Sequence, residues 1–171
     1  MAKKNRSLYV GKAGHLAVMS ELALRGYNVA MPEMDIGDDI FAVNDATAKM
    51  WRIQVKTATV KKEKANPPQT PPPRVVRPVK RRFQFRIKVT AITDAPRRDS
   101  CFVFVMRAAR RWRYCIIRGS KLEDRYRDKQ LGSENKGHVQ LWLTLDGDSL
   151  RAGGLDLSRH LDSWDDVFPR I

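Results

Sequence analysis

Residues 39–57 constrain the fold more than any other stretch, because in them two apolar segments flank a short polar break. The first segment is 39–43, the break is 44–49, and the second segment is 51–57. The break is rich in Asn and Asp, which tolerate turn conformations, whereas Trp and Thr in the second segment favour strands. The pattern therefore predicts a β-hairpin.

This hairpin is expected to carry a small polar site. Side chains two positions apart on a strand share a face, so Gln54 and Lys56 point the same way. We expect Asp39, across the hairpin, on that face as well. A carboxylate, an amide oxygen and an ammonium group then converge at one end of the sheet.

The composition indicates one globular domain. The 171 residues are 42% apolar and 30% charged, and no apolar run approaches the roughly 20 residues that span a bilayer. We expect a single domain over 1–171 in a cytoplasmic protein that is not secreted, and nucleoid-associated in a prokaryote. Cys101 and Cys115 fall in separate predicted strands, where packing is a better account of them than a disulfide.

The charge predicts the kind of partner. The formal net charge is +14 and the isoelectric point is about 10.2. An excess of Lys and Arg favours a polyanion through counterion release. We expect a nucleic acid, with duplex DNA before RNA. A membrane partner is not expected, because the basic residues do not lie on one amphipathic helix.

A proline-rich basic insertion interrupts the predicted strands at about residues 58–82. Prolines donate no backbone hydrogen bond, so the segment cannot be central sheet. Three interpretations are open: a basic flap on a nucleic-acid backbone, an unstructured insertion, or a ligand of SH3 type. The residues predicted to bind nucleic acid lie in this segment and in the strand after it: Lys61, Lys62, Lys64, Arg74, Arg77, Lys80, Arg81, Arg82, Arg86 and Lys88.

An acidic loop precedes Asp39. Glu33, Asp35 and Asp38 lie close together in a chain that is otherwise strongly basic. One interpretation is a solvated turn. The other is that a hard divalent cation relieves the repulsion between the carboxylates.

A helix is predicted over residues 11–26, before the hairpin. At 100° per residue its apolar arc contains Leu16, Met19, Leu22, Ala23 and Leu24. His15 falls near the centre of this arc and is expected to face the sheet, whereas Glu21 is expected to face water. Gly26 ends the helix, and a strand follows at 27–30.

The rest of the chain predicts further strands and two helices. Strict alternation marks a half-exposed strand at 83–89, and an almost wholly apolar run marks a buried central strand at 101–106. Residues 112–117 and 139–145 read as strands, the former as the hairpin partner of 101–106. A capping box at Ser120–Glu123 predicts a helix that Gly132 ends, and Ser158 is expected to cap a last helix.

Four short motifs, all within residues 11–57, resemble those of the PD-(D/E)XK nuclease superfamily. They are Gly11-x-x-Gly14-His15-x-x-Val18, Leu22-x-x-x-Gly26-Tyr27, Asp39-Ile40-x-Ala42 and Ile53-Gln54-Val55-Lys56-Thr57. The sequence is similar to the branch in which Gln replaces the acid of the third motif, as in some intron-encoded homing endonucleases and related prokaryotic proteins. The resemblance implies an α/β fold with a restriction-endonuclease-like central mixed β-sheet flanked by helices.

The resemblance also implies an activity, that of a Mg²⁺-dependent DNA endonuclease, with Mn²⁺ as an alternative ion. Asp39, the amide oxygen of Gln54 and the backbone carbonyl of Val55 are implied as metal ligands, and Lys56 as the group that orients the attacking water. The chemistry of these residues agrees, because a hard cation prefers oxygen ligands and an ammonium group stabilises developing negative charge.

His15 departs from the family pattern, which usually has a glutamate at this position of the helix. A neutral imidazole is a poor ligand for Mg²⁺ but an acceptable one for softer ions. Three interpretations of His15 are open. It is a catalytic or hydrogen-bonding group at the site, a core histidine, or the mark of an inactive nuclease fold.

Three functions are therefore compatible with the sequence. A metal-dependent endonuclease that cuts both strands requires a homodimer or a higher homo-oligomer, because one site cuts one strand. The alternative is an inactive nuclease fold that only binds nucleic acid. The third is a small basic RNA-binding or ribosome-associated protein.

Overall fold

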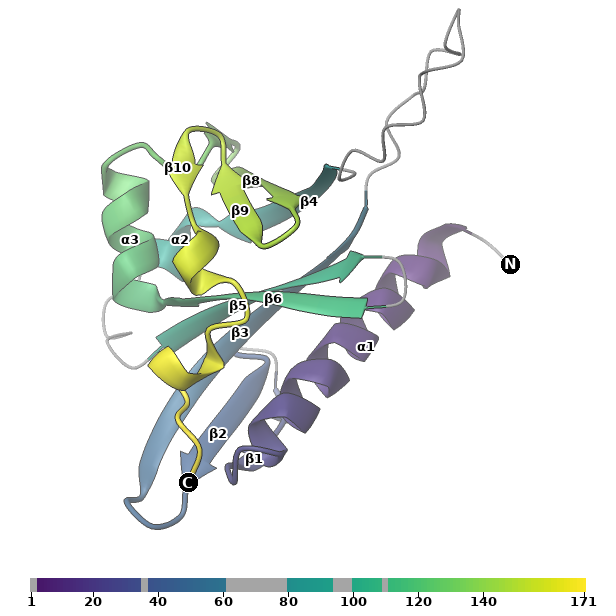
Figure 1. The fold of residues 1–171 in the computed structure, drawn as a ribbon. Helices are drawn as coiled ribbons and strands as arrows, with labels where there is room; N and C mark the ends of the chain where they lie inside the picture. The colour runs from purple at the N-terminus through teal and green to yellow at the C-terminus, as the bar shows by residue number, and fades with distance from the viewer. Residues whose placement is uncertain (1–2, 35–36, 61–79, 94–99, 109–110) are drawn as a thin grey trace, which may run out of the picture.

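The computed structural model describes residues 3–34, 37–60, 80–93, 100–108 and 111–171, which form two β-sheets and a few helices. One helix, α1, is long and lies along one side of the molecule (Figure 1). In the described part of the chain, no helix has the length and apolar character needed to cross a membrane.

The first sheet is five-stranded and mixed. Its order is β1-β2-β3-β5-β6, and only the β3–β5 pair is parallel. The predicted hairpin is confirmed as β2 and β3, with Ile40 opposite Ile53. The predicted central strand is confirmed as β5, paired on both sides. The strands are β1 (Asn28–Ala30), β2 (Ile40–Asn44), β3 (Lys49–Thr59), β5 (Ser100–Ala108) and β6 (Arg111–Arg118).

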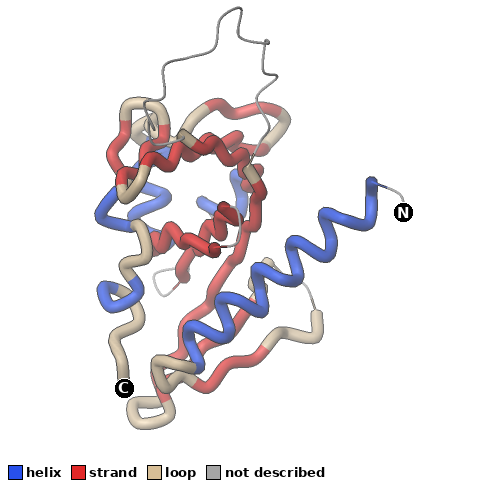
Figure 2. Tube along the Cα trace, turned by 45° about the vertical axis from the view of Figure 1, so that its right-hand side comes forward, coloured by secondary structure: helices blue, strands red, loops and turns tan. Residues whose placement is uncertain are grey.

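The second sheet is antiparallel and packs across one face of the first (Figures 1 and 2). Its order is β10-β9-β8-β4, and β7 also pairs with β8. The two predicted strands at 83–89 and 139–145 are its longest members and are neighbours. The strands are β4 (Arg81–Lys88), β7 (Ser133–Asn135), β8 (His138–Asp146), β9 (Ser149–Ala152) and β10 (Leu155–Asp156), with helices α2 (Val89–Thr93) and α3 (Gly119–Arg127) beside them.

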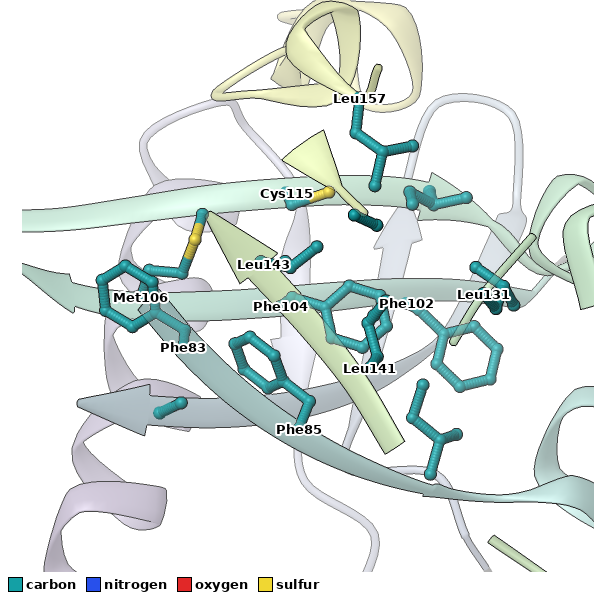
Figure 3. Packing of buried hydrophobic residues seen from close by; sticks show 14 of the residues in the cluster. Phe83, Phe85, Phe102, Phe104, Met106, Cys115, Leu131, Leu141, Leu143 and Leu157 are labelled. Atoms are coloured by element: carbon teal, nitrogen blue, oxygen red, sulfur yellow. The ribbon is translucent and has the colours of Figure 1, made fainter. Parts of the chain in front are cut away.

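Two apolar clusters cover the two faces of the first sheet. Between the sheets, Phe85 packs edge-on against Phe104, which stacks on Phe102 (Figure 3). On the other face, side chains of α1 pack on β3 and β5. Cys101 and Cys115 are free and buried, as expected, and burial raises the pKa of Cys101 to about 12.

Helix α1 spans Lys3–Ala23 and differs in orientation from the prediction. Val18 and Leu22 are fully buried, but Leu16 is 53% and Leu24 72% exposed. The expectation that the whole apolar arc faces the sheet is therefore wrong. Glu21 is half-buried rather than directed at water. Burial of Tyr114, and next the negative charge of Glu21, raise the pKa of Tyr114 to about 12.

The close approach of α1 to β3 explains this orientation. A Cβ atom added at Gly14 would lie 1.9 Å from Oγ1 of Thr57, so only glycine allows the helix to sit where it does. Gly14 therefore faces the sheet, and the helix is rotated away from the orientation that would bury all of its leucines.

Two further local predictions are wrong. Helix α3 has Arg118 at its N-cap with no side-chain capping bond, and it ends at Arg127, before Gly132. The predicted last helix is replaced by two 3₁₀ turns, Ser158–His160 and Trp164–Asp166. Trp164 and Phe168, which lie in the segment predicted as this helix, are nevertheless buried in the apolar cluster between α1 and the first sheet.

The two glycines of the first motif are predicted to respond in opposite ways to substitution. Gly14→Ala should lower the free energy of unfolding by about 1–3 kcal/mol, because the new methyl group overlaps Thr57. Gly11→Ala meets no atom within 4 Å and should raise it by about 0.5–1 kcal/mol, through helix propensity. Urea denaturation measures both. Equal effects at the two positions would contradict the packing described for α1.

Candidate functional site

The candidate site lies at the edge of β3 just past Ile53, the residue opposite the first residue of β2. The backbone N–H of Asp39 donates to the carbonyl of Ile53 at 2.9 Å, one position before β2 begins at Ile40. The next N–H of β3 that points this way is that of Val55. It donates to Oδ2 of Asp39 at 2.7 Å, so the carboxylate takes the place of the missing strand.

The backbone of Val55 contributes a second group to this place. The N–H and C=O of one strand residue point toward the same neighbouring strand. Because the N–H of Val55 points at Asp39, its carbonyl oxygen points to the same edge of β3, beyond the start of β2. The carboxylate and this carbonyl thus share one edge of the strand.

Gln54 supplies a third oxygen. Its Nε2 donates to the carbonyl of Gly37 at 2.8 Å, which fixes the amide plane and ties β3 to the loop before Asp39. Its Oε1 is buried and has no hydrogen-bond partner among the described residues. A buried acceptor without a partner costs about 1–3 kcal/mol, so this oxygen suits a cation or a hydrogen-bond donor.

Lys56 follows Gln54 on the same face of β3, as predicted. The parallel register places Gln54 opposite Phe102 and Lys56 opposite Phe104. Lys56 is half-buried, and its ammonium group forms no ion pair with any residue in the described ranges. Asp39 differs from the expectation in one respect, since its carboxylate lies at the strand edge rather than over the face that Gln54 and Lys56 share.

His15 reaches the same carboxylate from α1. Its Nε2 lies 3.8 Å from Oδ1 of Asp39, and the two side chains are 23% and 17% exposed. The helix therefore brings His15, one of the predicted site residues, to this end of the sheet. The two oxygens of Asp39 have different neighbours: Oδ2 is bound to the backbone of Val55, and Oδ1 faces His15.

Asp38 forms an ion pair with Arg52, a residue that the sequence analysis did not single out. Its carboxylate is 2% exposed and accepts from Nε of Arg52 at 2.8 Å, with Nη2 of Arg52 on the same oxygen. Arg52 stands opposite Phe41 in the hairpin register, so alternation along β3 could have indicated which strand face it occupies. Within the acidic loop, Asp35 lies outside the described residues and Glu33 is exposed.

The oxygen donors fit a hard divalent cation in kind. Asp39, Gln54 and Val55 offer a carboxylate, an amide oxygen and a carbonyl oxygen, and Mg²⁺ commonly takes one or two carboxylates and completes its shell with water or phosphate. In the described part of the chain no three His, Cys, Asp or Glu side chains cluster closely enough to hold a metal. Of the three oxygen donors, only the carboxylate of Asp39 carries a negative charge.

The predicted nucleic-acid-binding residues divide into two groups. Lys61, Lys62, Lys64, Arg74 and Arg77 lie outside the described residues. Lys80 directly precedes β4, and the other four lie in this strand: Arg81, Arg82, Arg86 and Lys88. Arg82, Arg86 and Lys88 are exposed on one face of β4.

The mixed sheet, with α1 on one face and the site at the start of β2, defines a restriction-endonuclease-like α/β fold, as the sequence implied. Among solved structures the chain is similar to a bacterial homing endonuclease, I-Ssp6803I. The TM-score is 0.53 at 13% identity, over 93% of this chain and 88% of that one. No family model and no curated protein matches the sequence.

Proposed function

We propose that the protein is a metal-dependent endonuclease of the PD-(D/E)XK type that hydrolyses phosphodiester bonds in DNA, in the branch with Gln in the third motif. The observation that carries the proposal is the position of Asp39, bound to the N–H of Val55 beside the buried acceptor of Gln54. The structural neighbour named as a homing endonuclease supports both the chemistry and the DNA substrate.

In this proposal Asp39, Gln54 and the carbonyl of Val55 hold the cation. Mg²⁺ or Mn²⁺ bound there supplies positive charge to the scissile phosphate and makes a nearby water more acidic. Asp39 is held in place through Oδ2, which leaves Oδ1 for the ion. The bond from Gln54 to Gly37 turns the amide oxygen, not the amide nitrogen, toward the remaining space.

In the same proposal Lys56 acts on the attacking water and the phosphate, and His15 transfers a proton. The ammonium group of Lys56 orients the attacking water and offsets the negative charge that develops on the phosphate. His15 lies 3.8 Å from Asp39 and is suited to transfer a proton at its Nε2.

A second function has an observation in its favour. Only one carboxylate, that of Asp39, lies at the described site, because Asp38 is paired with Arg52 and the helix position holds His15. A nuclease fold with so little negative charge at its centre is also suited to bind nucleic acid without cutting it.

Nicking of supercoiled plasmid separates the two functions. With Mg²⁺ or Mn²⁺ the protein should cleave plasmid, and Asp39→Ala and Lys56→Ala should each reduce the rate at least about 100-fold, because each removes charge from the reacting centre. Chelation of the metal should stop cleavage. Lys129→Ala, an exposed cation after α3, is the control and should cleave at the normal rate.

The results decide between the functions directly. DNA binding without cleavage in either metal would establish the binding protein and contradict the enzyme. Cleavage that persists in Asp39→Ala would move the active site elsewhere.

We also propose a homodimer, since cleavage of both strands needs two sites. The outer face of α1 supports it through a stripe at helical spacing, in which large and small exposed side chains alternate: Tyr9, Ala13, Leu16, Ser20 and Leu24. The order is the same in both directions from Leu16. An antiparallel contact about a twofold axis at Leu16 therefore sets Leu16 against its own copy, and Tyr9 against Leu24 of the second copy and the reverse, so large faces large throughout.

The stripe predicts the effect of one substitution on assembly. Leu16→Lys places two ammonium groups at the axis and should convert the dimer into a monomer. Leu8→Lys is the matched control, because Leu8 is 73% exposed but lies about 80° around the helix from Leu16. Light scattering after size exclusion measures the mass. A monomeric parent protein, or a dimer that survives Leu16→Lys, would refute this interface.

A further inference from the structure

The outer face of the β4–β8 pair carries cations along its whole length. The inner side chains of β4 are buried between the sheets, so every second residue points outward. The antiparallel register places Arg82 opposite Thr144, Gln84 opposite Trp142, Arg86 opposite Gln140 and Lys88 opposite His138. Positive and uncharged polar groups thus form two neighbouring rows.

Contacts within this face hold the rows in place. Gln84 donates through Nε2 to Oε1 of Gln140 at 2.8 Å, across the two strands. The guanidinium of Arg82 lies over the ring of Trp142, 5.0 Å from its centroid, and Arg86 approaches Nδ1 of His138 at 3.2 Å. The face is therefore ordered by its own side chains.

No carboxylate of the described residues neutralises these cations. Arg82, Arg86 and Lys88 form no ion pair there, whereas arginines elsewhere do, such as Arg52 with Asp38 and Arg113 with Asp162. Three unpaired cations on one strand repel one another, and a polyanion removes that cost.

A cleft adjoins the middle of this face. It has a volume of about 400 Å³ and lies between the first turns of α1, the end of β3 and β4. Arg6 lines it from α1, Thr57 and Thr59 from β3, and Gln84 from β4. Gln84 belongs both to the cleft and to the cationic face, so the two adjoin at this residue, and Arg6 adds a cation from the α1 wall of the cleft.

We infer that the outer face of β4–β8 and this cleft bind the sugar–phosphate backbone of duplex DNA. The inference rests on the proposed function for the choice of DNA. The groups on the surface are those that contact phosphates, namely Arg, Lys and polar hydroxyl or amide groups. Binding of single strands relies on aromatic side chains open to bases, but Trp142 is half-buried under Arg82.

The salt dependence of binding tests the inference without any cleavage. Binding of a labelled duplex to Asp39→Ala protein is followed by fluorescence anisotropy in EDTA at several salt concentrations. The triple variant Arg82→Gln, Arg86→Gln, Lys88→Gln should reduce the slope of log K against log salt by about 2.7, or about 0.9 for each phosphate that the protein no longer neutralises. Adding Arg6→Gln should reduce it by about 0.9 more.

Two controls keep the result specific. Lys121→Gln, Lys129→Gln, Arg159→Gln removes the same charge from exposed residues of which none lies on β4 or β8 or lines the cleft, and should leave the slope nearly unchanged. Arg82→Lys, Arg86→Lys, Lys88→Arg keeps the charge and should keep the slope. Equal slopes for the two glutamine triples, a reduced slope in the charge-keeping triple, or preference for RNA over duplex DNA would each overturn the inference.

The outcomes separate this inference from the proposed function. Binding that depends on β4 in a protein that never cleaves DNA would contradict the nuclease but keep the surface. Cleavage by a protein whose binding does not depend on β4 would keep the nuclease and contradict the surface.

Discussion

The hydrogen bond from the N–H of Val55 to Oδ2 of Asp39 is the contact on which the candidate site depends. Strand β3 runs on to Thr59, beyond the point opposite the start of β2 at Ile40, so its edge has backbone groups that no strand of the described residues pairs with on that side. A carboxylate placed at this edge accepts one of them. The same geometry leaves a carbonyl and a buried amide oxygen beside it, so a sheet edge that would otherwise be a liability becomes a set of oxygen donors.

Charge is arranged on two scales around this contact. Locally, Arg52 neutralises Asp38, and Nε2 of His15 lies 3.8 Å from Oδ1 of Asp39. Globally, the chain carries a net charge of +14, and three of its cations are exposed side by side on β4 without carboxylate partners among the described residues. Basic residues thus outnumber acidic ones, 33 to 19, and the three cations on β4 are available to a polyanion.

The hairpin and the strands were predictable from the sequence because their patterns are local. Alternation along 83–89 and an apolar run at 101–106 depend only on which face of a strand is buried, and both predictions are confirmed. Gln54 and Lys56 share a face for the same reason. The motifs also indicated the class of fold.

The errors concern contacts between distant segments. The orientation of α1 depends on how closely Gly14 approaches Thr57, more than forty positions along the chain, and an apolar count over the helix cannot detect that. The pairing of Asp38 with Arg52 depends on the hairpin register, and it leaves Asp39 as the one carboxylate of the described residues at the site, where the acidic loop suggested several. The predicted last helix is absent, yet Trp164 in the second 3₁₀ turn and Phe168 just after it are both buried in the core of the first sheet.

Titration of Mn²⁺ into the protein, followed by calorimetry, tests the central claim most directly, since it reports on the oxygen donors whether or not the protein cleaves DNA. We expect one site that is lost in Asp39→Ala and at least about tenfold weaker in Gln54→Leu, while Glu33→Ala, which removes an exposed carboxylate of the neighbouring loop, binds as the parent does. Equal affinity in the parent protein and in Asp39→Ala would contradict the account.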